Sequence, residues 1–551
     1  MQRAGMPGGE IARAAAELRP RRNGSGLSLV VLAFAFVASL PLLVAILSFL
    51  GGAGDVWPHL ARYVLPQALS NTLWLAAGVA TGTAIIGVSL AWFVAACEFP
   101  GRRFFSWALL LPMAMPGYVL GFAFVALFEY TGPLQGGWRQ LFGSSAYFPD
   151  VGARGAAIFT LTLTLYPYVY LIVREAFASQ GIRGLEVARS AGFPPLQGFV
   201  RVTLPMARPW IVAGVSLAVM ESLADFGTVK LFNYQTFTTA IYRAWYGLFS
   251  LQSALQLSLV LVVLVLVALL LERRLRGRAR YTDPGTARQS RRITLSAGRA
   301  WSVALFCGTI LFVAFGLPAG LIVMWSFENF ALEFNSGYWR LIANTLMLAG
   351  FAALFIAAVA LLLGFTVRRS PGVVNRSLAR VATLGYAIPG AVLAVGFFVP
   401  VAWLSRALNH LLAGNDGSVI ALQSGLMVIF LAYLARFLAV AHGPVESALQ
   451  RIRPSVEEAA RGMGVSGMRL LGRVHLPILR PAILTAALLV FVDLMKELPI
   501  TLMTRPFGWD TLAVRVFQLT TEGEWERAAM PAVAIVIAGL LPVILLTRRR
   551  Y

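Results

Sequence analysis

Acidic residues occur at matching positions in two long apolar segments of the sequence. Glu221 and Asp225 stand in the first segment, and Asp493 and Glu497 follow 272 residues later in the second. Residues four apart share one face of a helix, so each pair would present both carboxylates together. Carboxylate oxygens are the ligands that hard cations prefer. Four carboxylates around one axis would therefore suit a hard cation within an apolar region.

The sequence leaves two interpretations of these acids open. Charged side chains inside a membrane are costly and mark functional sites by default, so the acids and Lys496 are candidates for lining a substrate path. Alternatively, the acids pair with arginines or backbone groups and hold the helices together, and Asp225 and Glu497 lie nearer the membrane surface. No residues are assigned as a metal site, because the 4 histidines are scattered.

A second duplicated pattern precedes these acids. Each copy has a glutamate, small residues, a glycine and a later Leu-Pro step, at Glu186, Ala188, Gly192, Leu204 and Pro205 in the first copy and at Glu458, Ala459, Ala460, Gly464, Leu476 and Pro477 in the second. A glutamate suits the first turn of a helix, and glycine can end it. Proline is tolerated where the next helix starts. The pattern predicts a short helix, a turn and a new helix, with alanines small enough to allow close approach to another surface.

The elements that position these residues are membrane-spanning helices. The chain has 551 residues, 58% hydrophobic and 13% charged, whereas soluble domains carry about 25% charged residues. Many apolar runs reach the roughly 18–20 residues that cross a bilayer. We expect about twelve spans and an all-α polytopic membrane protein, with spans near 27–50, 72–96, 105–128, 156–172, 210–229, 255–271, 303–325, 345–366, 381–403, 419–440, 482–502 and 530–546.

The duplication extends over the whole chain. Asn71-Thr72-Leu73 recurs as Asn344-Thr345-Leu346, and Met115-Pro116-Gly117 recurs as Ile388-Pro389-Gly390. Six spans in each part predict a parallel repeat about a pseudo-two-fold axis along the membrane normal, with the ligand path between the halves. The expected divisions are a cytoplasmic tail (1–26), a first repeat (27–272, core about 65–272), a basic cytoplasmic linker (273–299) and a second repeat (300–551, core about 340–547).

The net charge of +22 could suggest nucleic acid, but the positions of the charges argue against it. If the spans alternate from a cytoplasmic N-terminus, 34 of the 46 Lys and Arg residues lie inside. This bias follows the positive-inside rule and predicts that both termini are cytoplasmic. The expected surroundings are the lipid bilayer, with the linker near anionic headgroups. We expect the first apolar run to be kept as an anchor, since it lacks a clear cleavage site.

In its duplicated signature, the chain resembles the permeases of type I binding-protein-dependent ABC importers, here with two repeats fused. The second copy matches the family pattern EAA-x3-G-x9-I-x-LP except for Val474 in place of Ile. The first copy also has Val187 in place of the first alanine. The resemblance implies that each copy is a coupling helix that docks into a groove on an ATPase subunit, in the inner membrane of a bacterium.

The chain itself lacks the sequence needed to hydrolyse ATP. A P-loop requires Gly-Lys-[Ser/Thr], but Lys230 follows Val229 and Lys496 follows Met495, and these are the only lysines. We therefore expect a transport subunit that is not an enzyme and binds no cofactor, with ATP and Mg²⁺ held by a partner. Two coupling helices imply two ATPase copies. No outside loop is long enough to capture substrate, which implies a separate extracytoplasmic solute-binding protein.

Three further stretches are similar to the ferric-iron branch of these permeases, at Leu165–Tyr170, Leu223–Phe232 and Met495–Leu519. This resemblance implies import of Fe(III) by alternating access. Importers for thiamine, aminophosphonates or sulfate share the architecture and remain alternatives. A secondary transporter driven by ions would also permit tandem halves and intramembrane acids, but it gives no reason for the duplicated cytoplasmic signature.

Overall fold

Long apolar helices make up nearly all of the structure. The computed structural model describes residues 25–52, 56–130, 132–143, 152–180, 183–276, 292–412 and 425–548, and in these ranges only four residues form strands. Eleven helices of the described ranges are long and apolar enough to cross a membrane. The predicted all-α polytopic fold is therefore confirmed.

The long helices follow each other in a similar order in both halves, whereas the strands and several short elements, such as α7 and η4, do not match; short 3-10 turns (η2, η6) and π turns (the other η elements) stand between helices. The first half contains α2 (Ser25–Leu50), α3 (Trp57–His59), η1 (Leu60–Val64), α4 (Leu65–Ala96), β1 (Cys97–Glu98), α5 (Arg102–Ala108), η2 (Leu111–Ala114), α6 (Gly117–Phe128), α7 (Pro133–Phe142), α8 (Ala153–Gln180), α9 (Arg183–Ser190), α10 (Pro195–Gly198), η3 (Phe199–Thr203), α11 (Leu204–Ala224), α12 (Gly227–Leu231), α13 (Phe237–Tyr242), η4 (Arg243–Gly247) and α14 (Leu251–Arg276). The second half contains β2 (Ile293–Thr294), α15 (Ala297–Leu311), η5 (Phe312–Gly316), α16 (Leu317–Glu328), α17 (Phe330–Glu333), α18 (Ser336–Arg369), α19 (Val373–Thr383), η6 (Leu384–Ala387), α20 (Gly390–Leu412), α21 (Leu426–Arg451), α22 (Pro454–Gly462), α23 (Met468–Leu470), η7 (Leu471–His475), α24 (Leu476–Met495), α25 (Pro499–Thr504), α26 (Leu512–Thr521) and α27 (Trp525–Arg548).

Two of the expected spans are not continuous helices. The span near 105–128 is divided into α5, η2 and α6, and the span near 381–403 is divided into α19, η6 and α20. Proline is the cause at both breaks, because it favours an extended residue before it and starts a new helix after it. Met115 and Ile388, which precede Pro116 and Pro389, are extended.

The seventh expected span, near 303–325, consists of α15, the π turn η5 and α16. The fifth and eleventh, near 210–229 and 482–502, extend beyond the ends of α11 and α24 into the short helices α12 and α25. The remaining expected spans correspond to single long helices. The fourth and tenth are intact, since α8 continues through Pro167 and α21 continues through Arg436. The predicted start of the tenth span, at 419, lies outside the described residues. The twelfth expected span lies within α27, which is not among the eleven membrane-crossing candidates.

The repeated Asn-Thr step performs the same task in both halves. In the first half, Asn71 Nδ2 donates to the Gln235 carbonyl at 2.9 Å, and Thr72 Oγ1 accepts from the Phe237 amide at 3.3 Å. In the second half, the side chains of Asn344 and Thr345 make the matching bonds, to the carbonyls of Gly508 and Asp510 and from the amide of Leu512. Each pair ties the second span of its half to the loop before α13 or α26, so the sequence duplication is also a structural one.

The first span of each half packs on the other half. Helix α2 lies against α19 and α20 of the second half, and α15 and α16 lie against α5 and α6 of the first half, while α2 also packs on α14 and α16 on α27 within their own halves. Close approach of α2 depends on Gly396 of α20, where an added Cβ would stand 2.5 Å from the Pro41 Cβ. Spans one and seven therefore join the two halves to each other.

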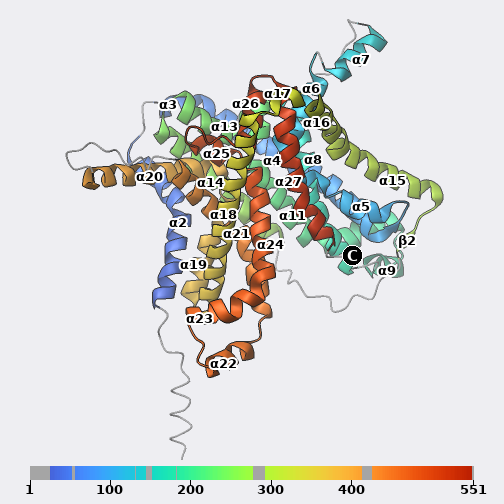
Figure 1. Cartoon of the computed structure of the whole chain (residues 1–551). Helices are drawn as coiled ribbons and strands as arrows, with labels where there is room; N and C mark the ends of the chain where they lie inside the picture. Colours follow the sequence, from blue (N-terminus) through green and yellow to red (C-terminus); the bar gives the residue numbers. More distant parts are fainter. Residues whose placement is uncertain are drawn as a thin grey trace, which may run out of the picture.

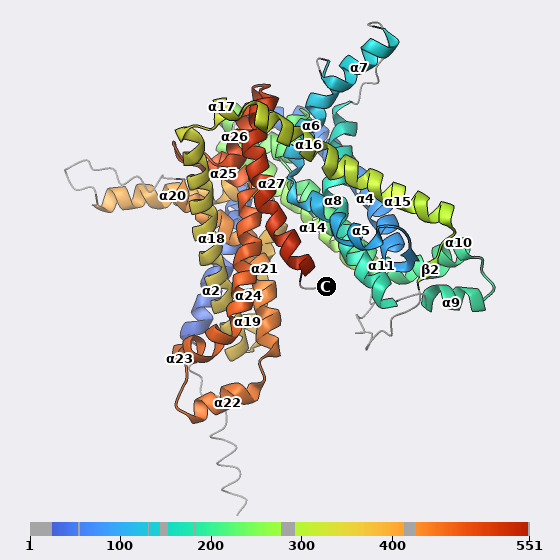
Figure 2. The same ribbon diagram turned by 45° about the vertical axis from the view of Figure 1, so that its right-hand side comes forward.

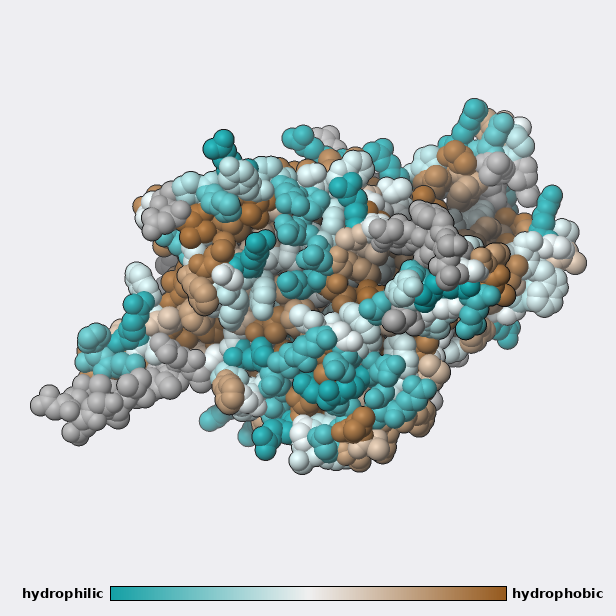
Figure 3. Space-filling model, turned by 90° about the horizontal axis from the view of Figure 1, so that it is seen from above, coloured by the Kyte–Doolittle hydropathy of each residue, from teal (hydrophilic) through white to brown (hydrophobic). Residues whose placement is uncertain are grey.

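The molecule has two arms that meet at one end and diverge toward the other (Figures 1 and 2). One arm contains α18, α21 and α24 and ends in α22; the other contains α4, α8 and α11 and ends near α9. The opposite end, with α13, α17 and α26, mixes hydrophilic and hydrophobic residues on its surface (Figure 3). The two repeated signatures thus lie at the diverging ends of the two arms.

The predicted linker and tail fall mainly outside the described residues, at 277–291 and 1–24. Where the chain is described again, β2 pairs in parallel with β1 of the first half, and Arg292 Nη1 lies 3.4 Å from a Glu98 carboxylate oxygen. Burial raises the pKa of the Cys97 thiol in β1 to about 11, so Cys97 is a neutral thiol at neutral pH. Cys97 and Cys307 are both free and buried. The expected domain boundaries stay predictions.

Candidate functional site

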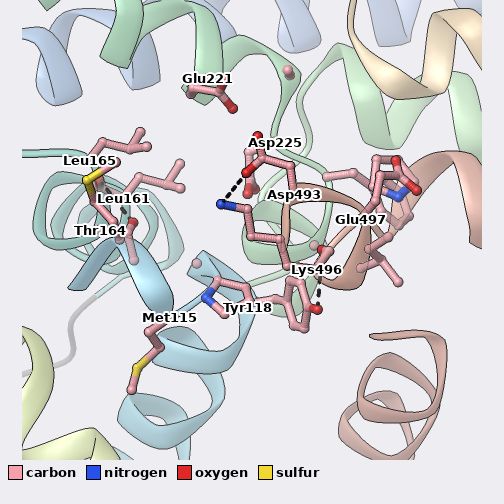
Figure 4. Close-up of a pocket in the computed structure, with 18 of the residues that line it drawn as sticks. Met115, Tyr118, Leu161, Thr164, Leu165, Glu221, Asp225, Asp493, Lys496 and Glu497 are labelled. Atoms are coloured by element: carbon pink, nitrogen blue, oxygen red, sulfur yellow. Dashed lines mark hydrogen bonds and ion pairs between the residues drawn. The ribbon is translucent and has the colours of Figure 1, made fainter. Parts of the chain in front are cut away.

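A charged chamber lies between the two halves (Figure 4). Its volume is about 160 Å³. All five predicted path residues line this chamber, together with an arginine that was not predicted. The acidic and basic residues in the chamber lining are Glu221, Asp225, Arg436, Asp493, Lys496 and Glu497. Four acids against two bases give the lining an excess of negative charge.

Asp225 and Glu497 do not lie on the helix faces predicted for them. Helix α11 ends at Ala224 and α24 ends at Met495, so neither acid shares a helix face with the acid four residues before it. Each acid instead accepts hydrogen bonds at the start of the short helix that follows. Such a carboxylate satisfies amides that have no partner within their helix and complements the helix dipole. The prediction of a shared helix face was wrong for these two acids, because their spacing in the sequence gives no sign that the helices end there.

The capping bonds are direct. Asp225 Oδ1 accepts from the Val229 amide at 3.1 Å, and its Oδ2 accepts from Thr228 Oγ1 at 2.9 Å. Glu497 accepts from the Ile500 amide at 2.9 Å, and from the amide and hydroxyl of Thr501 at 3.1 and 2.9 Å. This is the structural interpretation that the sequence left open for the two acids. Their carboxylates line the chamber while they hold α12 and α25 in place.

Glu221 and Asp493 have fewer fixed partners. Tyr386 of the second half donates its hydroxyl to Glu221 Oε1 of the first half at 2.6 Å. Lys496 Nζ lies 2.9 Å from Asp493 Oδ1, and both of these side chains are a little over one quarter exposed. Figure 4 shows the Lys496 amine directed at Asp493 beside Asp225. The partners of these two carboxylates are thus side chains, one from the other half and one from the same segment.

Arg436 is the site residue that the sequence revealed only as an interruption in a span. It stands 272 residues after Thr164, which lines the same chamber in the first half. Its buried Nε and Nη1 atoms have no hydrogen-bond partner within the described residues. Gly390 makes room for it, since an added Cβ would lie 2.6 Å from Arg436 Nη1 and 3.2 Å from Glu497 Oε1. The repeated Pro-Gly step therefore needs glycine because the chamber wall is tight there.

A larger cavity of about 800 Å³ adjoins the chamber. Five residues line both cavities and stand between them: Met113, Tyr168, Tyr386, Asp493 and Lys496. Three arginines from distant segments, Arg102, Arg174 and Arg292, line the larger cavity. Sequence reasoning missed these arginines and the two tyrosines, because none of them stands in a repeated pattern.

The chamber does not form a tight metal site. Within the residues that the structure describes, no three His, Cys, Asp or Glu side chains are grouped so that they could hold a metal ion. Two of the four carboxylates are already engaged by backbone amides, and a third pairs with Lys496.

Removal of the Glu497 cap should destabilise the protein. We expect Glu497→Ala to lower the free energy of unfolding by about 1–3 kcal/mol, because it leaves buried amides of α25 without a partner. The measurement is the midpoint of thermal unfolding in detergent. Asp225→Ala should act in the same direction, whereas the exposed Glu458→Ala should leave the midpoint unchanged. Equal midpoints for Glu497→Ala and the parent protein would contradict the capping role.

The two signature helices, α9 and α22, share one geometry. Glu186 and Glu458 are exposed, whereas Ala188 and Ala460 are 1% and 3% exposed and face the body of the protein. Val187, the departure from the family pattern, is 59% exposed. A valine is tolerated there because the position does not pack against the protein, and Ala459 is likewise exposed.

A glycine ends each signature helix in the left-handed region that other residues resist. Gly192 has φ +79° and Gly464 has φ +80°. The following amides, of Phe193 and Val465, return to the carbonyls of Ala188 and Ala460 at 2.9 Å, which closes each helix end. Leu204-Pro205 and Leu476-Pro477 then begin α11 and α24, as predicted from the sequence.

The sequence matches a known family twice. Residues 84–281 and 356–549 each match the binding-protein-dependent transport system inner membrane component, and together they cover more than half of the chain. The chain belongs to this family. It is thus the permease of an ABC importer, a multi-pass inner-membrane protein that works with a solute-binding protein and an ATPase. It is a transport component and not an enzyme.

Several relatives of the permease cover nearly all of it. The Fe(3+)-transport system permease protein FbpB 2 of Haemophilus influenzae is 27% identical over 537 residues, which is 96% of this chain and 99% of that protein. The ferric transport system permease protein FbpB of Actinobacillus pleuropneumoniae is 22% identical over 95% of this chain and 76% of its own length. The sulfate transport system permease protein CysT of Escherichia coli is 29% identical, but over 37% of this chain and 72% of its own length.

Proposed function

We propose that the permease imports Fe(III) that a solute-binding protein delivers from outside the inner membrane. The observation that carries this proposal is the chamber between the halves, whose lining holds four carboxylates and two basic groups. Carboxylate oxygens suit a hard trivalent cation. Two of the relatives that match over nearly the whole permease are named for ferric transport.

The signature helices are the proposed docking points for two ATPase copies. Each arm ends in one such helix, with its glutamate exposed and its alanine buried against the protein. ATP and Mg²⁺ would be bound by these partner subunits. In the orientation predicted from the charges, α9, α22 and both termini face the cytoplasm.

The arms are apart at the docking end, and the larger cavity lies next to the chamber, which fits a state open to the cytoplasm. In the proposed cycle, ATP binding draws α9 and α22 together and opens the chamber outward to receive Fe(III) from the binding protein. Hydrolysis then separates the arms. The residues between the two cavities, among them Tyr386 and Asp493, are the ones that must move to release the cation inward.

Uptake of labelled Fe(III) by a strain that lacks the native gene tests the proposal. The permease, expressed with its ATPase and binding protein, should restore Fe(III) uptake, and removal of ATP should stop it. Sulfate, thiamine and aminophosphonate uptake serve as controls. If uptake of one of these solutes is restored but Fe(III) uptake is not, the assignment of Fe(III) as the cargo is wrong. Uptake that persists without ATP would indicate an ion-driven transporter. A dianion such as sulfate is disfavoured by the excess of carboxylates in the chamber.

A further inference from the structure

Glu457, the residue before the signature glutamate, is held in a buried ionic junction. Its side chain is 13% exposed, and Arg368 Nε of α18 lies 2.5 Å from its Oε1. His475, which is 1% exposed and directly precedes α24, places its Nε2 3.3 Å from the same oxygen. Exposed Arg461 contacts the other oxygen at 3.2 Å. Glu457 thus ties α22 to α18 through an ion pair with Arg368, and it brings α22 into contact with His475 at the start of α24.

Arg368 extends the junction to a further helix. Its Nη2 donates to the Ile452 carbonyl at 2.7 Å, and its Nη1 donates to the Leu449 carbonyl. These carbonyls lie at the end of α21, where the last turn leaves acceptors without helical partners and favours a cation. A planar guanidinium holds several acceptors in fixed directions. One arginine thus joins the ends of α21 and α22.

The junction lies at the base of two helices that line the chamber. Helix α21 carries Arg436, and α24 runs from Leu476, directly after His475, to Met495 and carries Asp493. A movement of α22 is therefore passed along two continuous helices to charged residues of the chamber. No flexible segment separates the docking helix from these two helices at the junction, because the contacts are direct.

The matching positions of the first half hold residues of another kind. The residues at the positions matching Glu457, Arg368 and His475, which lie 272 or 273 residues earlier, are Leu185, Ala95 and Thr203, and none of them carries a charge. The two halves therefore differ at the point where each docking helix is attached.

Aromatic contacts take the place of charges near the first docking helix. Trp92 of α4 packs on Phe199 of η3 with ring centroids 4.6 Å apart, and on Phe177 of α8 at 5.2 Å. Such contacts depend less on direction than charge-assisted hydrogen bonds do. Helix α9 packs on η3, so apolar ring contacts of η3, and not charge-assisted hydrogen bonds, join this docking helix to α4 and α8.

We propose that Glu457 is a positioning residue that locks α22 to α21 and α24, so that the ATPase copy docked on α22 moves the chamber directly. The copy docked on α9 acts through the softer aromatic contact. The two coupling helices are then not equivalent, although their signatures are nearly identical. This inference rests on the proposed docking role of α22.

The test compares Glu457→Gln with the parent permease, each assembled with its ATPase and binding protein in proteoliposomes. Glutamine keeps the size of the side chain but removes its charge. We expect the ATPase to stay bound, while Fe(III) uptake per ATP hydrolysed falls about tenfold, a typical size for coupling between two sites. Arg461→Gln, which removes only the exposed partner, is the matched control and should couple like the parent.

A second measurement does not depend on the cargo. Spin labels on cysteines at exposed Val187 and Met463 report the distance between the docking helices, and labels at exposed Phe249 and Phe507 report the loops that follow η4 and α25. With a non-hydrolysable ATP analogue, Glu457→Gln should keep the first distance change and lose the second. Unchanged coupling in Glu457→Gln, or loss of the ATPase from this variant, would overturn the positioning role. If Glu458→Lys leaves the ATPase bound, the docking role of α22 fails instead.

Discussion

Glu221→Gln should lower Fe(III) uptake by at least about tenfold without loss of the folded protein. The substitution removes one negative charge from the chamber, whereas the glutamine oxygen still accepts the hydrogen bond that Tyr386 donates to Glu221 Oε1. One charge at about 4 Å contributes several kcal/mol at an effective dielectric constant near 20, and 1.4 kcal/mol corresponds to a tenfold change. The measurement is the initial rate of labelled Fe(III) uptake in proteoliposomes that contain the whole importer.

Tyr386→Phe is the matched control for this experiment. It removes the hydrogen bond between the halves but leaves the charge of the chamber unchanged. If the charge of Glu221 attracts the cation, uptake should fall much less in Tyr386→Phe than in Glu221→Gln. The opposite order would show that the bond between the halves matters and that the charge does not. Asp493→Asn should lower uptake as Glu221→Gln does, because it too removes a carboxylate charge from the chamber. In addition, it takes away the carboxylate that pairs with Lys496.

Short patterns with fixed offsets carried most of what the sequence could predict. The signature glycines and the Leu-Pro helix starts each depend on neighbouring residues, so their local structure follows from their order. The repeated Asn-Thr step showed the duplication, although its hydrogen-bond partners lie in a distant segment. Glu221 and Asp493 are also placed as expected, since matching positions in a parallel repeat face the same axis. Apolar runs located the spans, except where Pro116 and Pro389 divide them.

Contacts between distant segments were beyond reach of the sequence. Tyr386 and Arg436 contribute to the chamber through helices whose rotation only packing decides. Asp225 and Glu497 were assigned to helix faces, because the ends of α11 and α24 are not visible in an apolar pattern. Two consecutive glutamates, Glu457 and Glu458, look alike in the sequence, yet one is buried in an ion pair and the other is exposed.

Glu458→Lys should abolish uptake by preventing the ATPase from docking, while the permease stays in the membrane. Glu458 is exposed on α22, so its substitution disturbs no internal contact and should leave the thermal unfolding midpoint unchanged. Reversal of a charge in an interface opposes the complementary charge of the partner and costs several kcal/mol. The measurement is co-purification of the ATPase with the permease, together with uptake. Glu186→Lys on α9 should also weaken docking.

Gly464 tests the shape of the same docking helix. An added Cβ would meet no atom within 4 Å, so any effect of substitution arises from the backbone at φ +80°. Asparagine tolerates this conformation, whereas a β-branched residue does not. Gly464→Asn should therefore keep most ATPase docking, and Gly464→Val should lose it. Equal docking by the two variants would mean that the glycine turn does not set the direction of α22, and that the exposed face of the helix alone recognises the ATPase.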